Sequence, residues 1–230
     1  MSSEIEIKNK LYDELKDLFT PHLKNQEVIN NYPNEFIPIR GKLVKWIIKI
    51  CVKFHFRKET LYRTISIFDK YISLCQIKTY DNLYQFKIII IACLSISTKI
   101  NEVNANYIKF FTKNILNNKE NITNYRASDV YMKEVNILST INYCINSSNI
   151  CQFNSIFTNI CLSHIKSLKV KQLFLTINDK YLKQFIISAQ SISLSPVNGA
   201  ILIFNATLNH FSEKEIDKSA AVYSIENLKQ

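Results

Sequence analysis

The residue types that most often carry chemistry occur in this chain, but their spacing matches none of the usual catalytic or metal sites. The four histidines are scattered, and none stands in the H-E-x-x-H spacing of a zinc enzyme. Two glycines are too few to build a G-x-G-x-x-G loop, a P-loop or a G-x-S-x-G nucleophile elbow. The carboxylates are common but do not pair inside a suggestive loop. We therefore expect no catalytic residue, no metal site and no cofactor, and we expect that the chain is not an enzyme.

The six cysteines are predicted to be small buried residues. None forms a C-x-x-C pair and most lie in apolar runs, which is typical of a reducing compartment and not of disulfides or zinc ligands. The first ten residues are charged and lack an apolar signal core, so secretion is not expected. The longest apolar run, between Lys87 and Lys99, is far shorter than the ~20 residues of a membrane span, so no membrane partner is expected.

The formal net charge of +10 is compatible with nucleic acid, an anionic membrane or an acidic protein as a partner. The lysines are scattered instead of clustered, and the chain is rich in Lys, Asn and Ile, as AT-rich coding produces. The charge therefore has an explanation that needs no partner, and nucleic acid is not the expected ligand.

The hydrophobic spacing predicts an all-α protein. The chain is 47% hydrophobic, and its few glycines argue against all-β and nucleotide-binding α/β folds. Apolar residues recur at i, i+3, i+4 and i+7 between short polar breaks, which is typical of helices with one buried face. Pro38 suits the first turn of a helix, and Ser128 or Asp129 suits a cap. Helices are expected at about residues 5–23, 38–54, 61–72, 88–99, 107–115, 129–140, 150–160, 173–189 and from 196 onward.

The helical pattern starts again after residues 146–148. Ile67–Ile72 reads IFDKYI and Ile177–Leu182 reads INDKYL, which agrees with a duplicated helical unit. We expect an N-terminal helix and linker in residues 1–34, a first helical domain in 35–147 and a second repeat in 148–230.

Four charged residues stand where the helical pattern predicts burial. Glu134 lies on an apolar stripe, and Lys99 ends the apolar run. Buried charges are costly unless they are paired. The alternatives are a solvated edge for Glu134 and a side chain that extends to water for Lys99. Arg40 and Asp69 lie near the first two core helices, where an internal salt bridge would explain them.

The segments around these residues resemble the cyclin box. Ile39–Trp46 (IRGKLVKW) resembles its opening M-R-x-x-L-V-x-W, and Ile67–Ile72 resembles Y-I-D-R-F-L. Ser95–Glu102 (SISTKINE) is similar to L-A-S-K-F-E-E, and Met132–Tyr143 matches E-x-x-I/V-L followed by L-x-F. These matches occur in the family's order over about residues 36–145, and the second half resembles the second box of A- and B-type cyclins more loosely.

The resemblance implies a cyclin fold, with two repeats of about five helices preceded by an N-terminal helix. It implies a regulatory subunit that binds and activates a cyclin-dependent kinase in cell-cycle control, in the nucleus and cytoplasm. Residues 35–147 would be the N-terminal cyclin box, and residues 148–230 would be a C-terminal cyclin-like repeat that ends before the family's last helix. The alternatives are a cyclin-fold transcription factor, a transcriptional or phosphate-signalling cyclin, and a helical scaffold without a kinase.

The resemblance also assigns roles to individual residues. Lys99 and Glu134 match the charged pair that faces the kinase, while Arg40 and Asp69 match an internal salt bridge. The positions that match the pair's apolar surroundings at the kinase contact are Ile100, Leu138, Ile141, Tyr143 and Ile145.

A second surface of the family is altered in this chain. Ile39, Leu43 and Trp46 match most of the hydrophobic patch with which A-type cyclins bind substrate docking peptides. Lys49 and Lys87 stand at the family's acidic and amide positions, and like charges oppose a basic docking peptide. We expect either a patch with changed specificity or three residues that simply belong to the core.

Overall fold

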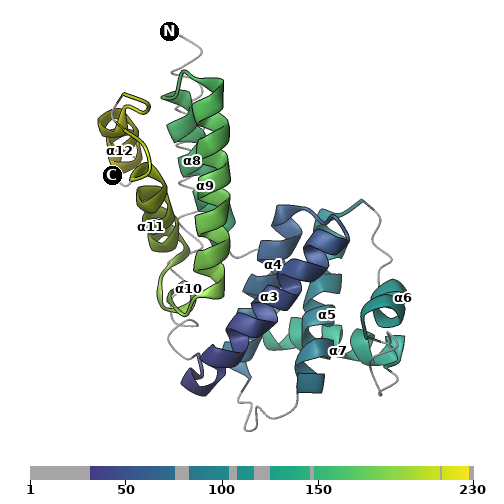
Figure 1. The fold of residues 1–230 in the computed structure, drawn as a ribbon. Helices are drawn as coiled ribbons and strands as arrows, with labels where there is room; N and C mark the ends of the chain where they lie inside the picture. The colour runs from purple at the N-terminus through teal and green to yellow at the C-terminus, as the bar shows by residue number, and fades with distance from the viewer. Residues whose placement is uncertain are drawn as a thin grey trace. The chain divides into compact units, whose positions relative to one another are not determined.

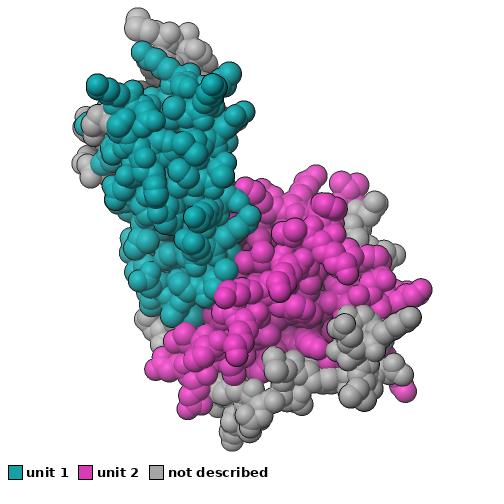
Figure 2. All heavy atoms as spheres, in the orientation of Figure 1, with its two compact units in different colours: residues 1–26, 148–230 teal, residues 27–147 magenta. Residues whose placement is uncertain are grey.

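The computed structural model describes residues 32–75, 83–103, 108–116, 125–145, 148–212 and 214–227. Within these ranges every regular element is a helix, and none of these helices is long and apolar enough to cross a membrane. The chain divides into two compact units, one of residues Glu27–Ser147 and the other of Ser148–Gln230 with residues 1–26 (Figure 2). The expected helix at residues 5–23 lies outside the described residues.

The first unit is built around one buried helix (Figure 1). The helix α5 packs against both α4 and α7, and each of its residues from 89 to 98 is buried, as its apolar sequence predicts. The elements of this unit are η1 (Asn34–Phe36), α3 (Ile37–Lys53), α4 (Lys58–Leu74), α5 (Leu83–Asn101), α6 (Ile108–Phe111), η2 (Thr112–Leu116) and α7 (Ala127–Thr140).

The turn between α3 and α4 closes α3 with a Schellman motif. The N–H of Phe56 donates to the carbonyl of Cys51 at 3.0 Å, and the N–H of His55 donates to that of Val52 at 3.2 Å. His55 therefore has a φ of 54°, in the left-handed region where glycine is usual. The carboxylate of Glu102 then caps α4, because it accepts the N–H of Arg57 at 2.9 Å.

The helix α7 begins and ends close to its predicted bounds, but its cap differs. Neither Ser128 nor Asp129 occupies the N-cap position, which belongs to Arg126. Asp129 instead reaches back from the first turn and accepts the N–H of Arg126 at 2.9 Å. After the helix ends at Thr140, Asn142 takes a left-handed conformation with a φ of 51°.

The second unit packs α8 and α9 against α11. Its elements are α8 (Ile150–Ser163), α9 (Leu168–Ile187), α10 (Gln190–Ser193), α11 (Pro196–Leu208) and α12 (Lys218–Asn227). Gly199 allows the close approach of α11, since a Cβ there would lie 2.7 Å from Ile150 Cδ1 and 2.9 Å from the Phe185 ring. One buried polar layer crosses this core, where the Asn154 amide donates to the Asn178 side-chain carbonyl at 2.6 Å.

The cysteines are all free thiols, as predicted, but they are not all buried. Cys144 follows the end of α7 and is exposed, and Cys75 is half-buried. The buried cysteines are Cys51, Cys93, Cys151 and Cys161. The apolar pattern locates the helix cores, whereas Cys144 lies in a turn whose side chains it does not fix.

Candidate functional site

An ion pair between Lys99 and Glu134 joins the end of α5 to the middle of α7. The Lys99 Nζ lies 2.6 Å from the Glu134 Oε2. The side chain of Glu134 is only 4% exposed, whereas that of Lys99 is 41% exposed. The ammonium therefore reaches a buried carboxylate from the solvent side. The alternative of a solvated edge position for Glu134 does not hold.

The Glu134 carboxylate is only half satisfied. Its Oε1 atom is buried and has no hydrogen-bond partner among the described residues. An ionised carboxylate accepts hydrogen bonds with both oxygens, and leaving one buried oxygen unpaired costs about 1–3 kcal/mol. The Glu134 carboxylate therefore has the capacity to accept one more hydrogen bond.

Exposed apolar residues occur on both helices beside this pair. On α5, Ile100 is 41% exposed and Val103 beyond the helix end is 87% exposed. On α7, Tyr131 is 56% exposed and Val135 is 43% exposed. We call these four residues the apolar rim.

The two rim residues of α7 did not stand out in the sequence. Tyr131, Glu134, Val135 and Leu138 follow the i, i+3, i+4, i+7 spacing of one helix face. This spacing could have identified Tyr131 and Val135 once Glu134 was singled out. A buried charge surrounded by exposed apolar side chains is typical of a protein-binding surface.

The end of α7 and the turn after it hold the other residues expected at this site. Tyr143 is 67% exposed and has a φ of 55°, so two consecutive left-handed residues present it to solvent. Leu138 and Ile145 are half-buried. Ile141 is 1% exposed and packs beneath the turn, so it offers no open surface in this structure.

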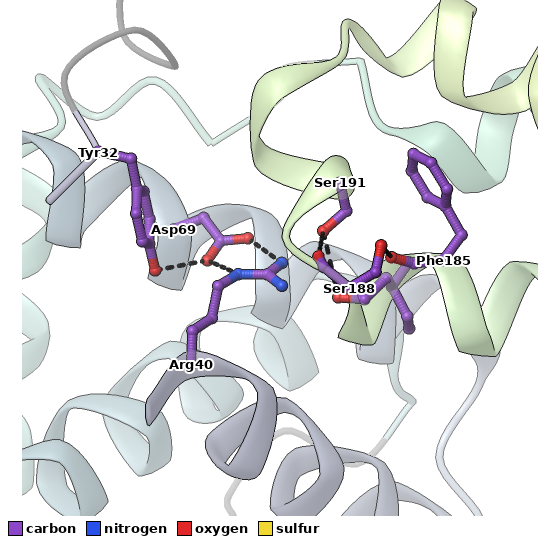
Figure 3. Close-up of polar contacts among 7 residues, drawn as sticks. Tyr32, Arg40, Asp69, Phe185, Ser188 and Ser191 are labelled. Carbon is purple, nitrogen blue, oxygen red and sulfur yellow. Dashed lines mark hydrogen bonds and ion pairs between the residues drawn. The ribbon is translucent and has the colours of Figure 1, made fainter. Parts of the chain in front are cut away.

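Arg40 and Asp69 form a bidentate ion pair inside the first unit (Figure 3). Arg40 Nε donates to Asp69 Oδ1 at 2.8 Å, and its second nitrogen donates to Oδ2 at 2.7 Å. The hydroxyl of Tyr32 adds a third bond to Oδ1 at 3.1 Å, which the sequence did not indicate.

The burial of this cluster fixes its protonation. Burial alone would lower the pKa of Arg40, but the Asp69 carboxylate outweighs burial and the pKa is raised. Burial raises the pKa of the Tyr32 phenol, and the charge of Asp69 raises it further. Arg40 stays charged and Tyr32 stays a neutral donor, so the cluster ties α3 to α4.

The residues of the expected docking patch are unequally accessible. Leu43 is 4% exposed, which agrees with the alternative that it belongs to the core. Ile39 and Trp46 are half-buried, and Lys49 is exposed three residues after Trp46 on the same helix face. Lys87 is half-buried on α5. The apolar surface that α3 offers here is limited to Ile39 and Trp46.

No group of three or more His, Cys, Asp or Glu side chains that could hold a metal ion occurs in the described part of the chain. Among known families, the model described as "Cyclin, N-terminal domain" matches residues 10–146. The matched segment includes Arg40, Asp69, Lys99 and Glu134.

Curated relatives and a solved structure agree with this match. The G2/mitotic-specific cyclin-B of Emericella nidulans is 25% identical over 146 residues, which are 63% of this chain and 28% of the relative. The G2/mitotic-specific cyclin-3 of Saccharomyces cerevisiae is 32% identical over 109 residues, which are 46% of this chain and 24% of the relative. The chain thus spans about a quarter of these relatives.

The viral cyclin from herpesvirus saimiri has a similar fold, with a TM-score of 0.64 at 17% sequence identity. The likeness covers 84% of this chain and 80% of that chain. The all-helical arrangement of the described residues is therefore a cyclin fold.

Proposed function

Because this chain belongs to the cyclin family, we propose that it binds a cyclin-dependent kinase through the Lys99–Glu134 pair and activates it. Cyclins are non-catalytic regulatory subunits, so the phosphotransfer chemistry belongs to the kinase. The observation that carries the proposal is the buried Oε1 of Glu134, which lacks a hydrogen-bond partner among the described residues. A backbone N–H of the kinase would supply the missing donor, and Lys99 would donate to a kinase carbonyl.

Activation follows from a difference in affinity between two kinase states. The regulatory helix of a protein kinase carries a glutamate that must pair with the ATP-binding lysine. A subunit that binds the inward position of this helix more tightly than the outward position shifts the kinase to the active state. Moving such an equilibrium from 1:99 to 99:1 requires about 5.5 kcal/mol of differential binding.

The charged pair alone does not supply this free energy. Truncating one partner of a buried charge pair typically costs about 2–5 kcal/mol of binding, which is less than the required amount. The remainder must come from apolar burial. Ile100, Val103, Tyr131 and Val135 of the apolar rim, together with Tyr143, offer the exposed surface for it. In this proposal the pair fixes the register of the complex, and the rim supplies affinity.

The similarity to mitotic cyclins supports a cell-cycle kinase as the partner and activity in the nucleus and cytoplasm. We assign residues 35–147 to the N-terminal cyclin box and 148–230 to a C-terminal cyclin-like repeat. We further propose that both follow the family's plan of about five helices each.

We also propose that substrate docking at α3 differs from that of A-type cyclins. A peptide seated on Ile39 and Trp46 would meet the exposed ammonium of Lys49. Like charges oppose a basic docking motif, so leucine-containing peptides led by arginine should not bind. Tight binding of such a peptide, lost on Trp46→Ala, would contradict this.

The decisive experiment is binding and activation of purified cyclin-dependent kinase catalytic subunits. The wild-type protein should bind at least one member of a kinase panel and stimulate its phosphotransfer, and it should show none alone. Glu134→Ala should weaken binding, whereas the exposed Lys180→Ala on α9 should not. If no kinase binds or responds, and none is recovered from a native extract, the proposal fails.

A further inference from the structure

A cluster of phenylalanines lies where the α3–α4 turn meets α6. The ring of Phe54 lies 5.1 Å from that of Phe110, edge to face, and the ring of Phe56 lies 5.9 Å from that of Phe111 in the same manner. Phe111 is buried, but Phe110 is 39% exposed. Part of the Phe110 ring is therefore exposed to solvent, while the rest of the cluster is packed together.

Cationic side chains surround this cluster. The Nζ of Lys53 lies 5.4 Å from the centroid of the Phe54 ring, and Lys109 precedes Phe110 in the chain. Residues 52–60 and 108–116 carry five lysines and arginines, all exposed, and a single carboxylate, that of Glu59. The five cations are Lys53, Arg57, Lys58, Lys109 and Lys113. Together with His55 and the rings of Phe54, Phe56 and Phe110, they form what we call the aromatic–basic surface.

The carboxylate of Glu102, which contacts the start of α4, is already used inside the protein. Its Oε1 accepts the N–H of Arg57 at 2.9 Å and the hydroxyl of Thr60 at 2.6 Å. It therefore caps a helix instead of pairing with the surface cations. Lys53, Arg57, Lys109 and Lys113 are all exposed, so this surface carries a positive charge that would attract an anionic partner.

His55 extends this surface across the α3–α4 turn. It stands at the left-handed position of the Schellman motif with a φ of 54°, and its side chain is exposed. A side chain in this conformation costs about 1–2 kcal/mol more than glycine. The cation-and-aromatic run from Lys53 to Lys58 thus continues without a break through the turn.

We propose that the aromatic–basic surface binds an acidic segment of a partner protein. Carboxylates of the segment would pair with the lysines and Arg57, and an apolar residue of the segment would pack on Phe110. The geometry favours a protein over a nucleic acid, because the rings contact one another and only that of Phe110 is freely exposed. Single-stranded nucleic acid needs a series of open ring faces for successive bases. This inference does not rest on the proposed kinase binding.

The test is fluorescence anisotropy of the full chain with a labelled peptide in which glutamates flank a single phenylalanine. The wild-type protein should bind it, and binding should weaken with added salt. Lys109→Glu with Lys113→Glu should weaken binding by about tenfold or more, since two charge pairs become repulsive. The matched control, Lys166→Glu with Lys169→Glu, makes the same charge change on exposed residues of the second unit and should bind normally.

A second variant separates binding from folding. His55→Gly removes an exposed side chain from this surface, so it should weaken peptide binding severalfold. It also relieves the left-handed strain of the turn, so the protein should become more stable to urea. The proposal is overturned if the peptide does not bind at low salt, or if the control pair reduces binding as much as the test pair. It is also overturned if single-stranded oligothymidylate binds more tightly than the peptide and loses binding with the same test variants.

Discussion

Replacing Lys99 and replacing Glu134 should affect the free protein unequally, although the two residues form one ion pair. Lys99→Ala leaves a carboxylate that is 4% exposed without its counter-charge, whereas Glu134→Ala leaves a lysine that is 41% exposed and can extend into water. Breaking a fully buried pair costs about 3–5 kcal/mol. The partial exposure of Lys99 reduces this, so we expect a loss of about 1–3 kcal/mol for Lys99→Ala.

Glu134→Ala should cost less than about 1 kcal/mol, because it also removes the unpartnered Oε1 and introduces a strong helix former. Urea titration of each variant measures these losses, and Lys180→Ala serves as the control for removing an exposed helical lysine. The double variant should be more stable than Lys99→Ala alone, since the stranded carboxylate is gone. The coupling in this double-mutant cycle isolates the pair.

Kinase binding should follow a different order from stability. Glu134→Ala should lose about 2–5 kcal/mol of binding free energy, a factor of about 30 to several thousand, while its fold is nearly intact. If Glu134→Ala destabilises the protein as much as Lys99→Ala does, the buried carboxylate does not lower the stability of the free protein, and the reasoning is wrong. If both variants bind kinase normally once folded, the pair is structural.

Three further predictions concern stability. His55→Gly should stabilise the first unit by about 1 kcal/mol in urea titration, and a loss would show that the imidazole makes compensating contacts. Gly199→Ala should destabilise the second unit by about 1–3 kcal/mol, because its Cβ would lie 2.9 Å from the Phe185 ring; an unchanged melting curve would contradict this. Burial raises the pKa of the Cys51 and Cys161 thiols to about 12, whereas an unfolded cysteine has a pKa of about 8.5. Between these two pH values the unfolded chain loses the thiol protons and the folded protein keeps them, so the free energy of unfolding falls as the pH rises from about 8.5 toward 12. The urea midpoint should fall over this range, less steeply in Cys51→Ala, and a flat profile would refute the assignment.

The helices were predictable because helix formation depends on local spacing. The apolar periodicity located α3 and α7 within two residues, and Pro38 lies in the first turn of α3 as expected. Two helix starts were predicted less well. The helix α5 begins at Leu83 and not near residue 88, and α9 begins at Leu168 and not near residue 173. The exposed leucines and lysines of α9 blur the periodic pattern at that end.

The candidate site was predictable only in part. The sequence singled out Lys99 and Glu134 because charges on an apolar stripe need an explanation, and it singled out Arg40 and Asp69 for the same reason. It did not separate Leu43 and Ile141, which are buried, from neighbours that reach the surface. It also gave no sign of Tyr32 as a third member of the Arg40 cluster. Each of these depends on which helix covers a given face.

The sequence by itself determined that this chain is helical, that it belongs to a known family and which charges are out of place on their helices. These properties follow from residue order and from the 3.6-residue period of a helix. Only the tertiary structure decided that Glu134 is buried while Lys99 is half-exposed, that one carboxylate oxygen is left without a partner, and that Phe110 packs on the α3–α4 turn. Burial and pairing depend on residues far apart in the chain, and the packing of helices sets those distances.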